Sequence, residues 1–251
     1  MRVITLILCL VWVPALQAQA LQESLRLFDA GTASIQNGQY VEAIEAFDQA
    51  LAAGYESAAL HYNRGIALYR LDRLGPAIAS FERARRLDPD HREVTHNLSI
   101  ARARIRDRMS VLPRTFTQSV WLWLDRSLGA RLLFLIGLSA YLVWVGIQTF
   151  RVLGRRYTDW HRRGVWAAGA VATLGLLLGL GLSMRPAEPP AAVIIADEAP
   201  VFPDATATSS ADFTVHEGVT VSVIGRSGDW TAVRLPNGVT GWVSSDQLLS
   251  V

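Results

Sequence analysis

Identical residues recur 34 positions apart in the N-terminal part of the chain. The matching pairs are Gly31 and Gly65, Ala43 and Ala77, Ile44 and Ile78, Phe47 and Phe81, and Ala50 and Ala84. A fixed period of this length is typical of stacked supersecondary units, which bury their apolar faces only against one another. The small residues allow two helices to approach closely, and the phenylalanines fill the space between units. The period therefore predicts a stack of helical hairpins.

The second copy resembles a tetratricopeptide repeat. Its motif begins with Gly65 and Leu68, continues through Ala77, Phe81 and Ala84, and closes at Pro89, which ends a helix because proline lacks an amide donor. The first copy is similar, but Tyr55 replaces the proline. A partial third unit follows, and we expect residues 93–109 to form its first helix. Because about three stacked units are needed for stability, we expect two full repeats and a capping helix over residues 21–112.

The resemblance implies a concave groove, lined by the first helix of each repeat, that binds a protein or peptide. The candidate groove residues are Phe28, Tyr62, Asn63, Ile66, Arg70, His96, Asn97 and Arg104. Asn63 and Asn97 lie one period apart and either hydrogen-bond an extended peptide backbone or satisfy helix ends and turns. Phe28 and Thr32 occupy the positions where some family members place a lysine and an asparagine that clamp a carboxylate. This difference argues against that form of recognition.

Two long apolar stretches follow the repeats. Leu132–Phe150 and Val165–Met184 contain no charged residue, and each is long enough to cross a bilayer core of about 30 Å as a helix. The connecting segment, 151–163, carries five arginines against Asp159, and a short basic loop of this kind stays in the cytoplasm. We therefore expect transmembrane helices at 132–150 and 164–184, a bacterial inner-membrane location, and periplasmic domains on both sides.

Tryptophan-rich sequence precedes the first apolar stretch. Residues 113–131 include Trp121 and Trp123, which suit the headgroup layer of a lipid bilayer, so they predict an amphipathic lead-in helix or, alternatively, a loop that contains tryptophan. In the second stretch, the spacing of Gly175 and Gly179 predicts close packing against the first.

The first 20 residues have the pattern of a secretory signal peptide. A basic start at Arg2 precedes the apolar run Val3–Val13, and Ala18 and Ala20 fit a cleavage site. A lipoprotein signal at Cys9 and an uncleaved anchor are the alternatives. Cys9 is the only cysteine, so its removal would leave no disulfide and no thiol nucleophile.

The C-terminal region, 191–251, changes to short alternating runs typical of strands, after a proline-rich linker at 185–190. Asn237-Gly238 is a strong hairpin signal. The order of Gly228-Asp229-Trp230 and Gly241-Trp242-Val243 resembles the bacterial SH3 family. That resemblance implies a small β-barrel that binds the cell wall or a protein. Its candidate groove residues are Phe202, Asp229, Trp230 and Trp242, although in so small a barrel a tryptophan is often part of the core.

No catalytic pattern emerges from the sequence. The five histidines are scattered without HExxH spacing, and no serine elbow, Walker loop or dinucleotide fingerprint is present. We therefore expect no enzyme activity, no cofactor and no metal. The sequence pI of about 9.0 reflects the basic segment beside the apolar stretches, so we also expect no nucleic-acid partner.

The whole arrangement is that of a multi-domain α + β membrane protein, and its order of parts resembles the BatE proteins of bacterial aerotolerance operons. The resemblance implies a non-enzymatic inner-membrane scaffold. Its implied partners are membrane proteins with von Willebrand factor A domains and other Bat-type proteins. The alternative is an envelope anchor or sensor that binds peptidoglycan through the SH3 domain.

Overall fold

The computed structural model describes residues 21–110, 115–116, 119–120, 130–153, 159–184, 189–205 and 210–251. The chain divides into two compact units, one formed by Met1–Leu112 with Pro189–Val251 and the other by Pro113–Glu188. We call them the repeat–barrel unit and the hairpin unit. The predicted signal peptide, 1–20, lies outside the described residues, as do most of the lead-in at 113–131 and residues 185–188 of the linker.

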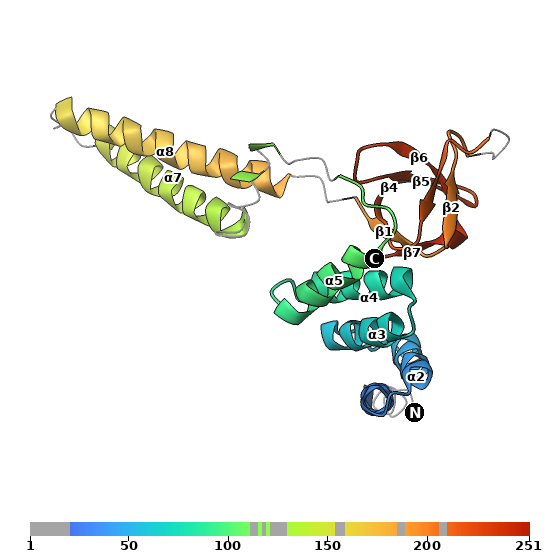
Figure 1. The fold of residues 1–251 in the computed structure, drawn as a ribbon. Coiled ribbons are helices and arrows are strands. Elements are labelled where there is room, and N and C mark those ends of the chain that lie inside the picture. Colours follow the sequence, from blue (N-terminus) through green and yellow to red (C-terminus); the bar gives the residue numbers. More distant parts are fainter. Residues whose placement is uncertain are drawn as a thin grey trace, which may run out of the picture. The chain divides into compact units, whose positions relative to one another are not determined.

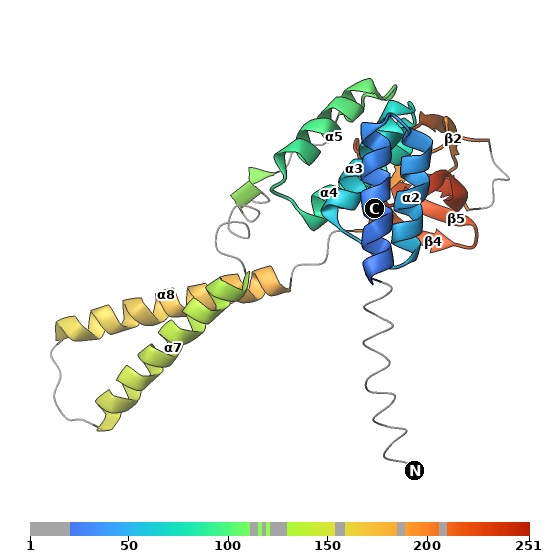
Figure 2. The same ribbon diagram turned by 90° about the horizontal axis from the view of Figure 1, so that it is seen from below.

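The repeats form a stack of antiparallel helices. A first helix covers residues 21–36 and lies beside α2 (Figure 2). The following helices stack in chain order (Figure 1): α2 (Tyr40–Ala52), α3 (Ala58–Arg70), α4 (Leu74–Leu87) and α5 (Arg92–Arg104). Tight turns separate them at Gly38 and Gly54, where φ is 76° and 88°, values that favour glycine. Ser57 begins α3 by accepting a hydrogen bond from the Leu60 amide.

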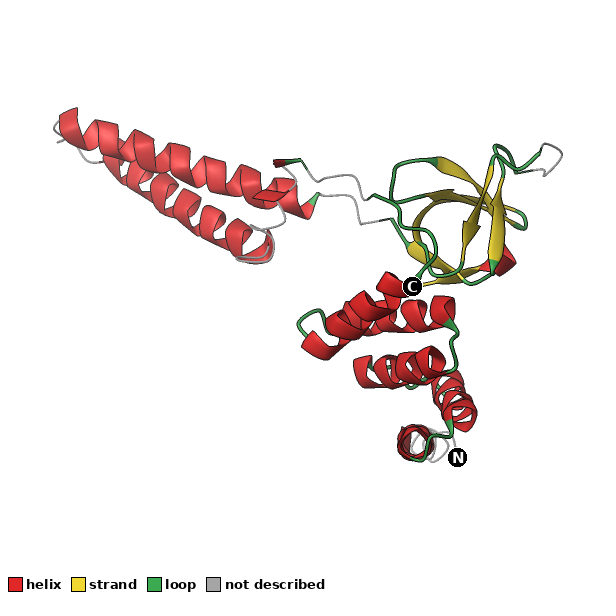
Figure 3. Ribbon diagram, viewed as in Figure 1, coloured by secondary structure: helices red, strands yellow, loops and turns green. Residues whose placement is uncertain are grey.

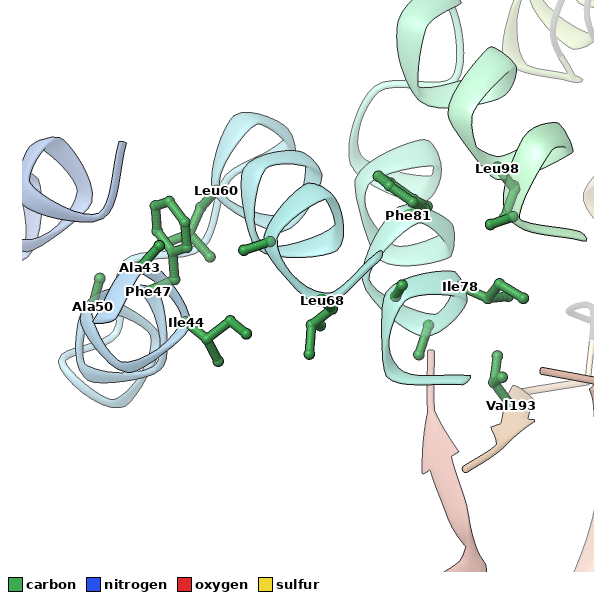
Figure 4. Packing of buried hydrophobic residues seen from close by; sticks show 14 residues of the cluster. Ala43, Ile44, Phe47, Ala50, Leu60, Leu68, Ile78, Phe81, Leu98 and Val193 are labelled. Atoms are coloured by element: carbon green, nitrogen blue, oxygen red, sulfur yellow. The ribbon is translucent and has the colours of Figure 1, made fainter. Parts of the chain in front are cut away.

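Glycine and phenylalanine fit together within each repeat. A Cβ atom on Gly65 would lie 2.6 Å from Cε1 of Phe81, and one on Gly31 would lie 2.7 Å from Cε1 of Phe47. Both phenylalanines are buried, and the core continues from α2 to α5 through Leu60 and other apolar side chains (Figure 4). The predicted close approach of the two helices in each repeat is confirmed.

The C-terminal region forms a small barrel (Figure 3). Its elements are β1 (Ala191–Ile194), β2 (Glu198–Val201), β3 (Phe213–His216), β4 (Thr220–Ser227), β5 (Trp230–Arg234), β6 (Thr240–Ser244), a 3-10 helix (Ser245–Gln247) and β7 (Leu248–Ser250). An antiparallel sheet has the order β6-β5-β4-β1-β7, and β2 pairs with β3. A bridge between Phe202 and Trp242 joins the two sheets. The alternation along β4 buries Val221 and Val223, as expected for a half-buried strand.

The hairpin unit consists of α7 (Ala130–Leu153) and α8 (Asp159–Ser183), which pack against each other along glycine-lined faces. A Cβ on Gly137 would lie 2.7 Å from the carbonyl carbon of Gly175, and one on Gly179 would lie 2.8 Å from Cα of Phe134. The predicted packing of Gly175 and Gly179 against the preceding helix is confirmed. The loop at 154–158 lies outside the described residues.

The expected membrane spans are not supported. Over the residues that the structure describes, no helix combines the length and the apolarity that crossing a bilayer requires. By this criterion the transmembrane helices at 132–150 and 164–184 are a wrong prediction, and so are the membrane part of the fold class and the inner-membrane location. The sequence pattern counts apolar residues without showing what covers them, and some of them lie in the contact between α7 and α8.

Candidate peptide-binding groove and barrel surface

A hollow of about 240 Å³ lies between the first helices of the second and third units. Its lining consists of Ile66, Tyr69, Arg70, Phe81, Asn97 and Ile100. The structure therefore brings together three of the predicted groove residues, Ile66, Arg70 and Asn97. Ile100 was not among the predicted groove residues, although the period that pairs Asn63 with Asn97 also indicates it, because Ile100 follows Ile66 by 34 residues.

Cationic side chains lie at the end of this groove. Arg70, the last residue of α3, is exposed. The guanidinium of Arg104, at the end of α5, lies 5.1 Å from the centroid of the Tyr69 ring, and its Nη2 donates to Oδ1 of Asp72 at 2.6 Å. Asp72 has φ of 60° in the turn between α3 and α4. The groove thus combines an apolar floor with a positively charged rim, and the carboxylate of Asp72 neutralises part of that charge.

The two predicted asparagines tie successive repeats together. Asn63 Nδ2 donates to Thr32 Oγ1 at 3.3 Å, and Asn97 Nδ2 donates to the Tyr62 hydroxyl at 2.9 Å. Thr32 in turn donates to the carbonyl of Phe28 at 3.0 Å. Both asparagine bonds use the amide nitrogen, so the side-chain carbonyl oxygen is the group that would accept a bond from a ligand backbone.

Phe28 and Tyr62 pack within their own repeats. The Phe28 ring centroid lies 6.0 Å from that of Phe47 and 5.8 Å from that of Tyr55, so the residue that replaces the repeat's proline completes this packing. The Tyr62 ring has the equivalent contact with Phe81, at 6.0 Å, and lies 5.5 Å from the ring of His91, just before α5. Burial, with a smaller effect from the charge of Glu93, raises the pKa of Tyr62. His96, the third residue in this register, is exposed on α5.

The barrel gathers the aromatic residues that the sequence predicts for its groove. Phe202 and Trp230 meet edge to face, with ring centroids 5.3 Å apart and planes at 81°. Phe202 and Trp242 exchange backbone hydrogen bonds of 2.9 and 2.8 Å. All three residues are partly buried. Asp229 is exposed in the turn before β5, and its carbonyl accepts a 2.8 Å bond from the Ser245 amide.

The barrel contains a hollow of about 340 Å³, which no sequence motif indicated. Its lining consists of Ala192, Val223, Arg226, Gly228, Thr231, Ser245, Leu248 and Ser250. The hydroxyls of Thr231 and Ser245 lie 2.8 Å apart and satisfy each other. Within the described segments, no group of three or more histidine, cysteine or acidic side chains is arranged to hold a metal ion.

Comparison with known families identifies both domains. A model described as a tetratricopeptide repeat matches residues 28–92, and one described as a bacterial SH3 domain matches residues 196–249. The chain contains tetratricopeptide repeats and a bacterial SH3 domain. Both are binding modules, so this pair of domains indicates a role in protein interaction or binding. No curated protein matches the chain.

Two solved tetratricopeptide structures are similar to part of this chain. The second repeat domain of Spaghetti (RPAP3), bound to the HSP90 peptide SRMEEVD, is 25% identical, covers 36% of this chain and 81% of its own, and has a TM-score of 0.33. The first repeat domain of Spaghetti, bound to the same peptide, is 21% identical, covers 33% and 94%, and has a TM-score of 0.23. At these TM-scores the likenesses carry no argument about what the present chain binds.

Proposed function

We propose that the protein is a non-enzymatic scaffold that holds an extended segment of a protein partner in the groove of its repeats. The observation that carries this proposal is the hollow between α3 and α5, where an apolar floor, an amide and two arginines converge. Ile66 is half-buried there, and Ile100 is 40% exposed. Neither isoleucine is fully covered by the fold itself.

Each part of the groove suits one element of a peptide. An apolar side chain that enters the hollow gains about 1.5–3 kcal/mol when it is fully buried. The carbonyl oxygens of Asn63 and Asn97 accept backbone amides of an extended segment. Arg70 and Arg104 favour a ligand with an acidic residue beside the apolar one, because Asp72 neutralises only part of their charge.

A pair of matched substitutions tests the groove. Ile100→Asp places a charge in the hollow, whereas Val41→Asp places the same charge at another exposed helical position, since Val41 on α2 is 53% exposed. After crosslinking in cells, we expect a specific protein to be recovered with the wild-type chain and with Val41→Asp, and to be lost with Ile100→Asp. Equal recovery with both variants, whose folding is checked by circular dichroism, would refute the groove as the binding site.

The proposed partners are Bat-type proteins, in particular those with von Willebrand factor A domains. The order of the repeats and the SH3 domain in the chain supports this proposal, because it resembles BatE proteins. A purified von Willebrand factor A domain from the same operon should bind the wild-type chain more tightly than it binds Ile100→Asp. If the domain shows no binding that depends on Ile100, the partner is a different protein.

The aromatic surface of the barrel favours a second candidate function, attachment to peptidoglycan. Phe202 and Trp230 are partly buried and their rings meet edge to face, and the partly buried Trp242 pairs with Phe202 through the backbone. Aromatic residues grouped in this way suit stacking on a sugar or peptide. The full chain should then sediment with purified peptidoglycan, and Trp230→Ala should release it. A wild-type chain that stays in the supernatant would exclude this function.

A further inference from the structure

We infer that the SH3 barrel replaces the missing second helix of the third repeat and is thereby a structural part of the peptide groove. In the first two repeats, α2 and α4 follow and cover the first helices, the helix at 21–36 and α3. After α5 the backbone becomes extended at Ile105, with φ of −63° and ψ of 147°, and residues 105–110 are not helical. The inference deepens the proposed function, on which it rests.

Apolar side chains of the barrel cover the last face of the repeat stack. Ile78 and Ala79 on α4 are fully buried, although α5 is the one described helix that follows α4 in the repeat stack. Val193 of β1 belongs to the repeat core and lies beside Ile78 (Figure 4), and Leu249 and Val251 pack against the same core. A terminal repeat ordinarily needs a polar outer face, so the apolar face of α4 is matched to the barrel.

Polar contacts surround this apolar patch. Oε1 of Glu217 accepts a 2.7 Å bond from the Gly75 amide at the start of α4, and Arg83 Nε donates to the Ser250 carbonyl at 3.1 Å. Beyond α5, Asp107 accepts a 2.6 Å bond from the His216 amide and lies 2.9 Å from Nδ1 of the same residue. On the repeat side these contacts come from α4 and from the segment after α5, and on the barrel side from residues 216–217 and from β7, so they fix the position of the barrel.

Ile105 is the residue that joins the two cores. It packs against both the repeat cluster and the barrel cluster, and Met109 follows it into the barrel. Ile105 also lies against Gly218, where a Cβ would be 2.5 Å from Cγ2 of Ile105 and 3.0 Å from Cδ1 of Ile78. Because Gly218 has no side chain, the barrel presents bare backbone to Ile105, and its φ of 91° is also one that favours glycine.

The position of α5 affects the groove because α5 carries groove residues. Asn97 and Ile100 line the hollow and Arg104 forms its rim. On the repeat side α5 is held by packing of Leu98 and by the ion pair between Arg102 and Glu82. Its other attachment is the segment 105–109 in the barrel. The junction therefore positions one wall of the proposed binding site.

Two glycine substitutions in the full chain test this inference. Gly218 and Gly238 have φ of 91° and 89°, so alanine strains the backbone equally at both, but a Cβ on Gly238 meets nothing within 4 Å. In hydrogen exchange with mass spectrometry, we expect α5 amides to exchange at least about tenfold faster in Gly218→Ala than in Gly238→Ala, the factor expected from overpacking a fitted contact. Exchange in β5 and β6 should be alike in both.

Equal exchange of α5 in the two variants would overturn the inference. If Gly218→Ala unfolds the barrel as well, Asp107→Ala decides, because it removes only the contact with His216 and should raise α5 exchange in the same direction. Ile100→Asp separates this inference from the proposed function, since it should abolish partner recovery without loosening the 105–109 junction. Loss of α5 protection in Gly218→Ala alongside unchanged partner recovery in Ile100→Asp would retain the junction and reject the groove.

Discussion

From the contact between Gly65 and Phe81 we predict whether alanine at position 65 raises or lowers the free energy of unfolding. Alanine at position 65 would place its Cβ 2.6 Å from a ring carbon of a side chain that is 1% exposed, so the ring has little room to move. Overpacking of this kind costs about 1–3 kcal/mol. Replacing a glycine inside a helix with alanine gains about 1 kcal/mol. We therefore expect Gly65→Ala alone to lower the unfolding free energy by up to about 2 kcal/mol.

The same substitution should stabilise a chain that lacks the ring. Phe81→Ala removes a buried aromatic side chain and should cost about 3–5 kcal/mol. In that background the alanine at position 65 meets a cavity, so its helix-propensity gain of about 1 kcal/mol should appear without the opposing clash. The double-mutant cycle should therefore show a coupling of about 1–3 kcal/mol.

Native-state hydrogen exchange in increasing urea measures these free energies on amides of α3 and α4, separately from the hairpin unit. Gly31 and Phe47 provide an internal repetition of the experiment, since the corresponding distance is 2.7 Å. Effects that add within about 0.5 kcal/mol in both repeats would refute the argument that glycine is required there for close approach.

Three further results are expected. Burial lowers the pKa of His61, so the folded state binds fewer protons than the unfolded state. The free energy of unfolding should therefore fall as the pH drops below about 6.5. In urea titrations, His61→Gln should make that fall less steep. Burial raises the pKa of Glu217, so its stabilising contribution is present at low pH and lost as pH rises through the folded pKa. Glu217→Gln should match the wild type near pH 4 and exceed it at pH 8 in thermal unfolding; a deficit at pH 8 would contradict this. Phe202→Ala should destabilise the barrel by about 1 kcal/mol, through loss of the edge-to-face contact with Trp230, and unchanged exchange in β5 would count against that contact.

The repeats and the barrel could be predicted because their signals are local. The small size of Gly65 and the bulk of Phe81 indicate that two helices pack closely. Asn237-Gly238 specifies a turn, in which Gly238 has φ of 89°. Positions on the groove are harder to predict from the sequence. The first helix of a repeat has both a groove face and a face toward its partner helix, and these adjoin, so Phe28 and Tyr62 pack mainly against aromatic rings of their own repeats.

The junction could not be predicted because nothing local encodes it. Gly75 and Glu217 lie 142 residues apart in the sequence, and neither belongs to a motif that would indicate the other as its partner. The prediction of membrane spans was wrong although the spacing of Gly175 and Gly179 correctly indicated a helix pair. The apolar composition of the two stretches resembles that of membrane spans, but it does not show which of their side chains the helix pair covers.

The repeat–barrel unit is discontinuous in sequence, with residues 113–188 inserted between its two parts. During synthesis the repeats are complete long before the strands that cover Ile78, so α4 has an uncovered apolar face until nearly the whole chain has been made. The long insertion adds little to the free energy needed to bring the two parts together, because each doubling of loop length costs only about 0.6 kcal/mol. Pairing of α7 with α8 shortens the effective loop further. The junction also restricts domain exchange. A different SH3 domain would fit this chain only if its residues matched Ile105, Asp107 and the outer face of α4.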